Sequence, residues 1–325
     1  MKRFILTVIL ILTCINLFSR ELDDLFDIEH RFENRNGPLH TRVASIWQGI
    51  NLTFQAHSAN TLKKGEILAG FQFLLSNFYS ETLYTTDNKY EIHSDVETYL
   101  YIFEFEYGIF DWFTVGVELE FKHHHSGIMD PFIQSFHRTF KTPNGGREYA
   151  NDDNLDFRII DSFSGKTLMS ITDYVFALSD ILIKTRFRIL QTNKKEFILG
   201  AILGLKLPTG SPSNMTGSGS FDFGAGLLMD IAPFSWWIFY VNVFYIINGD
   251  FKGPNGFVVD LANKMQLFVT SEFLISNKTS LILSFNMFNS AWDKMNVKTL
   301  YMDKISQRIS GTGYQVFIGF KYRIS

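Results

Sequence analysis

An alternation of residue types near the C-terminal end, residues 314–324, constrains the fold most strongly. Apolar or aromatic residues occupy every second position from Tyr314 to Ile324, and Gln315, Lys321 and Arg323 are among the residues between them. A period of two is typical of a β-strand whose two faces meet different surroundings. A soluble sheet can show the same pattern, so the fold class depends on how often the alternation recurs.

The alternation recurs along most of the chain. In one clear segment, Phe113, Val115 and Val117 alternate with Thr114 and Glu118. Such segments have about 9 to 13 residues, close to the length with which a tilted strand crosses a bilayer. The predicted strands are residues 65–76, 95–107, 113–122, 180–190, 197–207, 221–229, 237–246, 264–273, 279–287 and 314–324.

The polar face of these strands carries charged residues. A soluble barrel buries its apolar face, but here the apolar face is long and aromatic, and no helical layer is available to cover it. Lipid is the simpler cover. We therefore predict an all-β fold, a transmembrane antiparallel β-barrel of about 10 strands, or 12 if the longest loop holds a further hairpin. The predicted lumen-lining residues are Glu118, Glu120, Lys122, Lys184, Arg186, Arg188, Lys206, Lys264, Glu272, Lys321 and Arg323.

The connections alternate between short and long. Tight turns fit at residues 108–112, 191–196, 232–236 and 275–278, and the links between them are long. In outer-membrane barrels the short turns face the periplasm. An even number of strands starting at residue 65 then leaves both ends of the barrel on the periplasmic side.

The composition agrees with a membrane barrel. Of the 325 residues, 46% are hydrophobic and 16% aromatic, including 34 Phe, which suits aromatic girdles at two interfaces. The formal net charge of -3 gives no indication of a nucleic-acid partner. Residues 231–247 approach the length of a transmembrane helix, but Pro233, Asn242 and many β-favouring residues indicate a strand.

The first residues have the pattern of a secretory signal peptide. Lys2 and Arg3 precede a largely apolar run, and small Ser19 ends it, so we predict a signal peptide at residues 1–19. The only cysteine, Cys14, lies in that run, and a lipoprotein site there is the alternative. A chain cleaved after Ser19 has no thiol, which excludes disulfides and cysteine catalysis. Residues 20–64 are predicted to form a periplasmic or lumenal segment, and residues 65–325 the barrel.

The link from residue 123 to residue 178 is too long for a simple connection. Asp130 and Pro131 fit the start of a helix, and aromatic residues follow at helical spacing. We predict a short amphipathic helix that acts as a plug or lid, and the alternative is a loop packed on the rim. The plug or lid candidates are Asp130, Phe132, Ile133, Phe136, His137 and Phe140.

Two motifs invite a metal or phosphate site. His123, His124 and His125 are adjacent, but neighbouring residues of a strand point in opposite directions and no carboxylate stands at ligand spacing, so we interpret them as a solvated loop. Residues 211–220 are rich in Gly and Ser, but no P-loop helix with a Lys-Ser or Lys-Thr pair follows. The sequence therefore predicts no metal and no cofactor.

Some outer-membrane barrels are hydrolases with Ser, His and acidic residues at the rim. His93, His123 and His137 fall near the predicted outer side, but no Gly-x-Ser-x-Gly motif marks a nucleophile. We therefore predict that the protein is not an enzyme, with a rim hydrolase acting on lipid or peptide as an alternative.

Several residue strings resemble those of a known group. Residues 37–42, 126–137, 144–147 and 206–210 are similar to an uncharacterised bacterial family of outer-membrane β-barrels with a domain of unknown function. The last string, Lys-Leu-Pro-Thr-Gly, is also similar to one in barrels associated with phenol degradation. In addition, residues 319–324 resemble the C-terminal signal read by the barrel-assembly machinery.

The resemblance implies the outer membrane of a diderm bacterium, with outer-membrane lipid and the barrel-assembly machinery as partners and no nucleic acid. It implies no known activity. The charged polar face favours passive passage of small solutes through a narrow lumen. The alternative is a plugged structural or surface-interaction barrel, because eight strands already enclose an interior that side chains fill.

Overall fold

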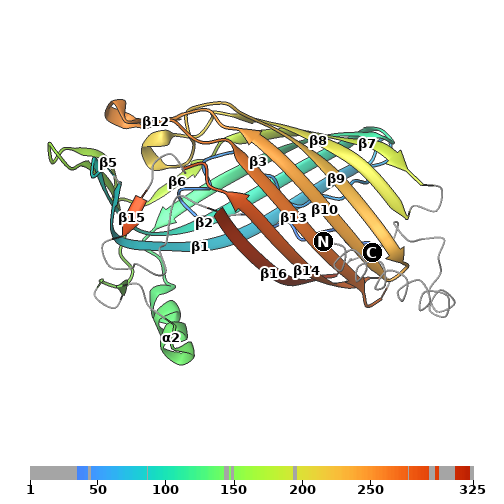
Figure 1. Cartoon of the computed structure of the whole chain (residues 1–325), viewed down its shortest axis with the longest axis horizontal. Coiled ribbons are helices and arrows are strands. Elements are labelled where there is room, and N and C mark those ends of the chain that lie inside the picture. The colour runs from blue at the N-terminus through green and yellow to red at the C-terminus, as the bar shows by residue number, and fades with distance from the viewer. Residues whose placement is uncertain are drawn as a thin grey trace, which may run out of the picture.

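The computed structural model describes residues 35–42, 45–85, 87–142, 146–147, 150–192, 196–276, 278–292, 297–299 and 312–322 (Figure 1). Most of these residues belong to one 14-stranded sheet whose strands pair antiparallel. The prediction of an all-β chain is confirmed. No helix within the described residues combines the length and apolar character that a transmembrane helix needs.

The long strands form one continuous path through this sheet, and we call them the wall strands. Each pairs with the next along the path, and each of the predicted segments lies in one of them. They are β1 (Ile67–Thr85), β2 (Tyr90–Phe110), β3 (Phe113–His125), β7 (Ile181–Gln191), β8 (Phe197–Leu207), β9 (Asp222–Phe234), β10 (Trp237–Ile247), β13 (Lys264–Leu274), β14 (Thr279–Asn289) and β16 (Thr312–Tyr322).

The two ends of this path are β1 and β16. Within the described residues β16 pairs with β14 alone, and β1 pairs with β2 and, at residues 83–85, with β15 (Val297–Thr299). Figure 1 shows the wall strands tilted and side by side in a curved sheet. Closure of the sheet into a barrel, and the number of strands in it, stay predictions.

The wall has two faces of opposite character. Along β2, Phe103, Phe105 and Tyr107 are 38%, 46% and 46% exposed, whereas Glu104 and Glu106 between them are 3% and 4% exposed. The same division runs through the other wall strands, so we call the exposed apolar side the outer face and the buried polar side the inner face. A soluble protein has the reverse arrangement.

The turns divide the wall into two ends. Short turns join β2 to β3, β7 to β8, β9 to β10 and β13 to β14 at one end, which we call the short-turn end. The other end, the long-loop end, carries the remaining described elements. They are α2 (Asp130–Phe140), β4 (Asp156–Asp161), β5 (Thr167–Ile171), β6 (Val175–Leu178), η4 (Pro212–Asn214), β11 (Phe251–Lys252), η5 (Pro254–Gly256) and β12 (Val258–Val259).

The long-loop end differs from the sequence prediction in three respects. Strands β1 and β2 continue beyond residues 76 and 95 as a paired extension, and the β4–β5 hairpin pairs with that extension of β2. This hairpin therefore adds no strand to the path of wall strands. Strand β3 continues through His125, so the three histidines lie in a strand and not in a loop, and His124 is fully buried against Thr98 (2.8 Å).

Aromatic side chains gather near both ends of the outer face. At the short-turn end, Phe110 stacks on Trp112 with ring centroids 5.5 Å apart, and Trp236 stacks on Trp237 at 5.9 Å. At the long-loop end, the rings of Tyr99, His123, His125, Tyr174 and Phe176 contact one another. Two such girdles are typical of a transmembrane barrel.

Candidate functional site: an inner face covered by an N-terminal segment

The inner face is covered by residues 35–42 and 45–62 of the same chain, which together we call the plug segment. Its later end lies at the short-turn end, where the Leu62 amide donates to Thr114 (3.0 Å). Its middle reaches the long-loop end, where Trp47 packs edge-on against Trp292 (4.9 Å). Its earlier end returns to the short-turn end, where the Asn36 side chain donates to Ser280 (2.8 Å). The described segment therefore passes along the interior twice.

The arm formed by residues 50–62 is extended but has no strand partner. Its backbone amides donate to wall side chains instead: Leu52 to Asp222 (2.8 Å), Phe54 to Gln266 (3.0 Å), His57 to Asn242 (2.8 Å) and Ala59 to Asp230 (2.8 Å). Backbone groups buried away from water need such partners. Polar side chains of four different wall positions thus take the place of a neighbouring strand.

Basic wall residues bind the carbonyl oxygens of the same arm. Lys206 Nζ donates to the Ile50 carbonyl (3.1 Å), and Arg186 Nη1 donates to the carbonyls of Ser58 (3.2 Å) and Asn60 (3.0 Å). Acidic and amide groups therefore accept from N–H donors, whereas basic groups donate to C=O acceptors. The charged side chains of the inner face therefore hold this arm through its uncharged backbone amides and carbonyls.

Two glycines make room for the one large aromatic ring of this arm. A Cβ atom at Gly224 would lie 2.5 Å from the Phe54 ring, and one at Gly204 would lie 2.8 Å from it. Phe54 fills the notch between β8 and β9 and stacks on Phe244 with centroids 4.7 Å apart. Any larger residue at either glycine would displace the ring.

The arm formed by residues 35–42 is held in a similar way. Arg42 forms ion pairs with Glu118 and Glu120 of β3, the latter at 3.1 Å. Lys321 of β16 donates to the carbonyl of Asn36 (2.9 Å), and the Asn36 amide donates to Glu272 of β13 (3.0 Å). This arm is thus bound to β3, which lies near one end of the wall path, and to β13 and β16, which lie near the other.

The predicted lumen-lining residues lie on the inner face wherever the structure describes them. All but Lys184 contact the plug segment directly, and Lys184 pairs instead with Glu104 and Glu106. Arg323 lies outside the described residues. The set that contacts the plug segment is Glu118, Glu120, Lys122, Arg186, Arg188, Lys206, Lys264, Glu272 and Lys321.

The predicted helix is present as α2, but its aromatic residues do not face the lumen. Phe132, Phe136 and Phe140 are exposed, Ile133 and His137 are half-buried, and only Asp130 is buried. Figure 1 shows α2 projecting sideways from the long-loop end of the wall. Residues 35–42 and 45–62 cover the inner face instead, and a plug or lid role for α2 stays a prediction.

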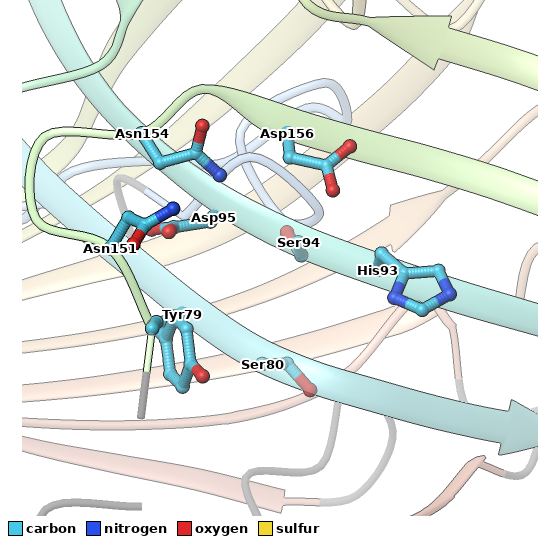
Figure 2. A pocket seen from close by; sticks show the side chains of 9 residues that line it. Tyr79, Ser80, His93, Ser94, Asp95, Asn151, Asn154 and Asp156 are labelled. Carbon is cyan, nitrogen blue, oxygen red and sulfur yellow. The ribbon is translucent and has the colours of Figure 1, made fainter. Parts of the chain in front are cut away.

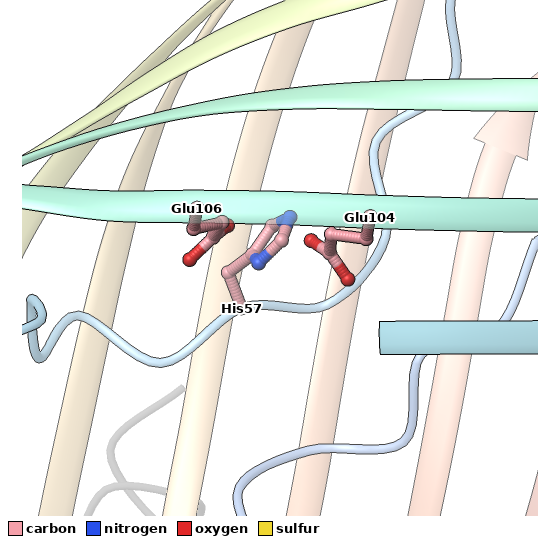
Figure 3. Close-up of side chains that lie close together, drawn as sticks. All are labelled: His57, Glu104 and Glu106. Atoms are coloured by element: carbon pink, nitrogen blue, oxygen red, sulfur yellow. The ribbon is translucent and has the colours of Figure 1, made fainter. Parts of the chain in front are cut away.

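A polar cavity of about 330 Å³ remains between the plug segment and the wall. Its lining includes His40, His57, Glu104, Glu106 and Arg186. Figure 3 shows the ring of His57 between the two carboxylates, and one ligand atom of each of these three residues lies within 4.8 Å of the others. Such a group can hold a divalent cation.

The two carboxylates already have cationic partners, however. Lys184 pairs with Glu104 and lies 3.3 Å from Glu106, and Arg186 pairs with Glu106. A metal ion would have to displace the Lys184 amine. The expectation that the chain binds no metal stays a prediction.

A second cavity, of about 250 Å³, lies at the long-loop end (Figure 2). Tyr79, Ser80, Ser94 and Asn151 are among the residues that line it. Its histidine, His93, is held by Glu91 (2.7 Å) and lies 3.5 Å from the Thr82 hydroxyl, while Asp95 faces Arg147 (3.9 Å). These contacts direct the histidine and the aspartate to different partners.

Comparison with known proteins identifies the family. A family model described as "Protein of unknown function (DUF3187)" matches residues 26–294. The chain belongs to the DUF3187 family. The resemblance to a family of unknown function is thereby confirmed. No curated protein sequence matches this DUF3187 protein.

Three solved structures are similar to this DUF3187 protein at low identity. An outer membrane channel from Pseudomonas putida F1 is 12% identical, with a TM-score of 0.43 over 71% of this chain and 74% of that one. The P. putida toluene transporter TodX is 10% identical, with a TM-score of 0.38 over 82% and 70%. The CymD monoaromatic hydrocarbon channel is 8% identical, with a TM-score of 0.29 over 70% and 84%. These scores are too low to carry an argument.

Sequence reasoning missed several inner-face residues of this DUF3187 protein. Asp222, Asp230, Asn242 and Gln266 bind the plug backbone, but each stands alone between apolar neighbours or at the start of a strand. They would have been found by assigning to the inner face every polar residue, charged or not, that stands at an inner-face position of the alternation in its strand. The partner segment itself alternates only briefly, at Ile50, Leu52 and Phe54, and so short a pattern did not indicate its place.

Proposed function

We propose that this protein is an outer-membrane β-barrel of ten wall strands, whose lumen the plug segment closes at rest and opens to small solutes when it moves. The exposed apolar outer face supports the membrane part of this proposal. Lipid is the surrounding in which an outer face of this kind is stable, because no other described element covers it. Outer-membrane lipid and the barrel-assembly machinery are the partners that such a protein would meet.

The plug segment also supports closure of the wall. Lys321 of β16 donates to the Pro38 carbonyl, and His40, two residues later, lies 3.5 Å from Glu104 of β2. The inner faces of β16 and β2 thus contact the same short stretch of the plug segment, as they would in a closed wall with β1 between them.

The observation that carries the proposed passage is the way in which the plug is held. Its backbone is bound to the wall by hydrogen bonds with charged and polar side chains. Water can replace each of these bonds at a net cost of about 0.5–1.5 kcal/mol for a neutral bond and about 1.5–3 kcal/mol for a bond to a charged group. An inner face built from Lys, Arg, Asp and Glu remains well solvated after the segment leaves. A barrel that is permanently closed can instead fill its interior with its own interlocking side chains.

A plugged structural barrel is the second candidate. It is favoured by the apolar cluster at the long-loop end, in which Trp47 is fully buried between Trp292 and Phe157. This cluster fastens the middle of the plug segment to the loops. In that case the loops would be the working part of the molecule.

Planar-bilayer conductance separates the two candidates. We expect the mature chain to be nearly silent and a chain that lacks residues 35–62 to conduct steadily. Deletion of residues 130–140 is the matched control and should leave the mature chain silent, because α2 does not fill the lumen. A shortened chain that folds, as judged by heat-dependent gel mobility, and still does not conduct would overturn the proposed passage.

If the shortened chain does not fold, a reversible disulfide provides a second test of whether the plug segment moves. The Ser58 hydroxyl binds the Asp230 carboxylate (2.5 Å), so Ser58→Cys with Asp230→Cys places two thiols side by side in a mature chain that is predicted to have no other. Voltage-driven openings should vanish on oxidation and return on reduction. Openings that are indifferent to the disulfide would contradict movement of the plug segment.

A further inference from the structure

The helix α2 has two opposite stripes of side chains. Asp130, Gln134 and Arg138 stand four residues apart and form one stripe, whereas Phe132, Phe136 and Phe140 have the same spacing two residues out of phase. A shift of two residues is about 200° around a helix, so the stripes lie on opposite sides. The hydrophobic face of α2 is therefore narrow and well defined.

The polar stripe binds the protein. Asp130 pairs with Arg147 and accepts from the side chain of Asn77 (3.1 Å) and the amide of Asp153 (2.9 Å). Gln134 donates to Asp152 (2.5 Å). In a soluble protein an amphipathic helix packs its apolar stripe on the core and turns its polar stripe to water. Here the arrangement is reversed.

The aromatic stripe faces away from the protein. Phe132, Phe136 and Phe140 are 66%, 47% and 64% exposed, and Ile128 just before the helix is 73% exposed. Phe136 and Phe140 contact each other with ring centroids 4.5 Å apart. Within the described residues the aromatic stripe is left to the surroundings, as is the outer face of the wall.

The position of α2 on the wall is given by the strand register. The outer face ends its apolar band in a row of three paired residues, Leu75, Tyr99 and His123. The next outer-face row is Asn77, Glu97 and His125, and this is the row that holds the start of the helix. The turn before α2 donates from Gly127 to His125 (2.9 Å) and from Met129 to Glu97 (3.0 Å).

Two residues along a strand correspond to about 7 Å. The helix thus leaves the outer face one row beyond the apolar band, beside the aromatic girdle that includes Tyr99 and His125, and Figure 1 shows it projecting sideways rather than along the strands. Amphipathic helices that lie in a membrane interface bury their apolar face about 5–10 Å into the boundary between head groups and acyl chains. The distance of about 7 Å between the apolar band and the start of α2 is therefore within the depth to which such a helix buries its apolar face.

We infer that α2 is an interfacial helix, whose stripe of Phe132, Phe136 and Phe140 lies in the lipid of the outer leaflet beside the barrel. The basic residue His137 in its last turn and the following Lys141 suit anionic head groups. The inference rests on the proposed membrane barrel, but not on a conducting lumen.

Spin labels on single cysteines test this placement. The only cysteine of the chain, Cys14, lies in the predicted signal peptide, so each mature variant carries one thiol. Phe136→Cys probes the aromatic stripe, and Arg138→Cys on the opposite stripe is the matched control. Phe71→Cys, on the outer face of β1 and 59% exposed, reports on the wall. Each labelled variant is placed in vesicles of phosphatidylcholine and phosphatidylglycerol.

The readout is the ratio of collisions with oxygen, which enriches in lipid, to collisions with a nickel chelate, which stays in water. We expect a ratio at Phe136→Cys several-fold above that at Arg138→Cys and close to that at Phe71→Cys. A water-like ratio at Phe136→Cys with a lipid-like ratio at Phe71→Cys would overturn the helix placement alone. A water-like ratio at Phe71→Cys would overturn the membrane barrel itself.

One further outcome also decides whether α2 lies in lipid. Low collision with both reagents at Phe136→Cys would mean that protein covers the stripe, and this too would overturn contact with lipid. Because one label could disturb its own site, Phe132→Cys and Phe140→Cys repeat the measurement along the stripe. All three ratios should exceed that of the control, provided that each variant keeps its heat-dependent gel mobility.

Discussion

At the scale of single residues, charge on the inner face acts through hydrogen bonds to a backbone. Lys206 shows this most clearly, because its amine donates to the Ile50 carbonyl, to the Ser218 hydroxyl and to Asp180, and so uses its three protons. A lysine that the sequence suggested as a free lumen charge thus has one hydrogen bond to the plug segment and two to residues outside it. Ion selectivity could arise only after those bonds open.

The carboxylate of Asp230 provides a test at this scale. It accepts from the Ala59 amide and the Ser58 hydroxyl, and a buried donor left unpaired costs about 1–3 kcal/mol. In Asp230→Ala we expect the plug segment to open about tenfold more often. A cysteine at fully buried Ala56 should then react about tenfold faster with a polar thiol reagent.

The matched control is Asp161→Ala, at the end of β4, which should leave that reaction rate unchanged. An equal rate in Asp230→Ala and in the parent would show that this carboxylate does not hold the segment. Heat-dependent gel mobility of both variants shows whether the wall has kept its fold.

At the scale of elements, the plug segment is an ordered part of the fold without helix or strand. Its arms replace strand partners by wall side chains, and its middle is fastened by packing. Trp47 contacts Trp292 (4.9 Å) and Phe157 (5.1 Å), and the Trp292 indole donates to the Trp47 carbonyl (2.6 Å). The middle of the segment thus has an apolar attachment at the long-loop end, whereas Asn36 and Leu62 are held at the short-turn end.

We expect Trp47→Ala to make brief openings of the mature protein more frequent in planar bilayers. Removing a buried tryptophan costs about 3–5 kcal/mol, and here the loss falls on the attachment of the plug. Trp112→Ala removes the same side chain from the short-turn girdle, where it is 52% exposed, and should leave the openings unchanged. Equal opening frequencies in the two variants would contradict a latch at Trp47.

At the scale of the whole molecule, the distribution of polar and apolar side chains is the reverse of that in a soluble protein. The inner face carries buried Glu, Lys, Arg and Asp, the outer face carries exposed Phe, Leu, Ile and Val, and α2 repeats the same inversion outside the wall. A lipid surrounding would account both for the exposed apolar face of the sheet and for the exposed aromatic stripe of α2. In the proposed placement, the lipid around the outer face also covers the aromatic stripe one row beyond it.

Leu227→Arg tests that surrounding on the wall. Leu227 lies midway along the outer face of β9 and is 55% exposed, so in water an arginine there would cost little. In a bilayer it should lower the free energy of unfolding by about 2–4 kcal/mol. Phe163→Arg, in the exposed β4–β5 turn, is the control, and urea unfolding from vesicles measures both. Equal stabilities would contradict lipid at Leu227.

Much of the wall could be predicted because its signal is local. Side chains on a strand alternate with a period of two, so Phe113 to Lys122 or Trp237 to Ile246 reveal both their strand and their two faces without knowledge of any partner. The same alternation placed Lys122, Lys206 and Glu272 on the polar side. It failed at His124, because the end of β3 carries polar residues on both faces and looks like a loop.

The amino-acid sequence by itself determined the strands, their two faces and their order along the chain, since each depends on residues close together. Only the tertiary structure decided what fills the interior and where α2 lies. The plug segment is held by contacts such as Asn36 with Ser280 and Trp47 with Trp292, which are 244 and 245 residues apart. Its extended backbone meets its partners only after the wall has curved around it, so no local pattern encodes its position.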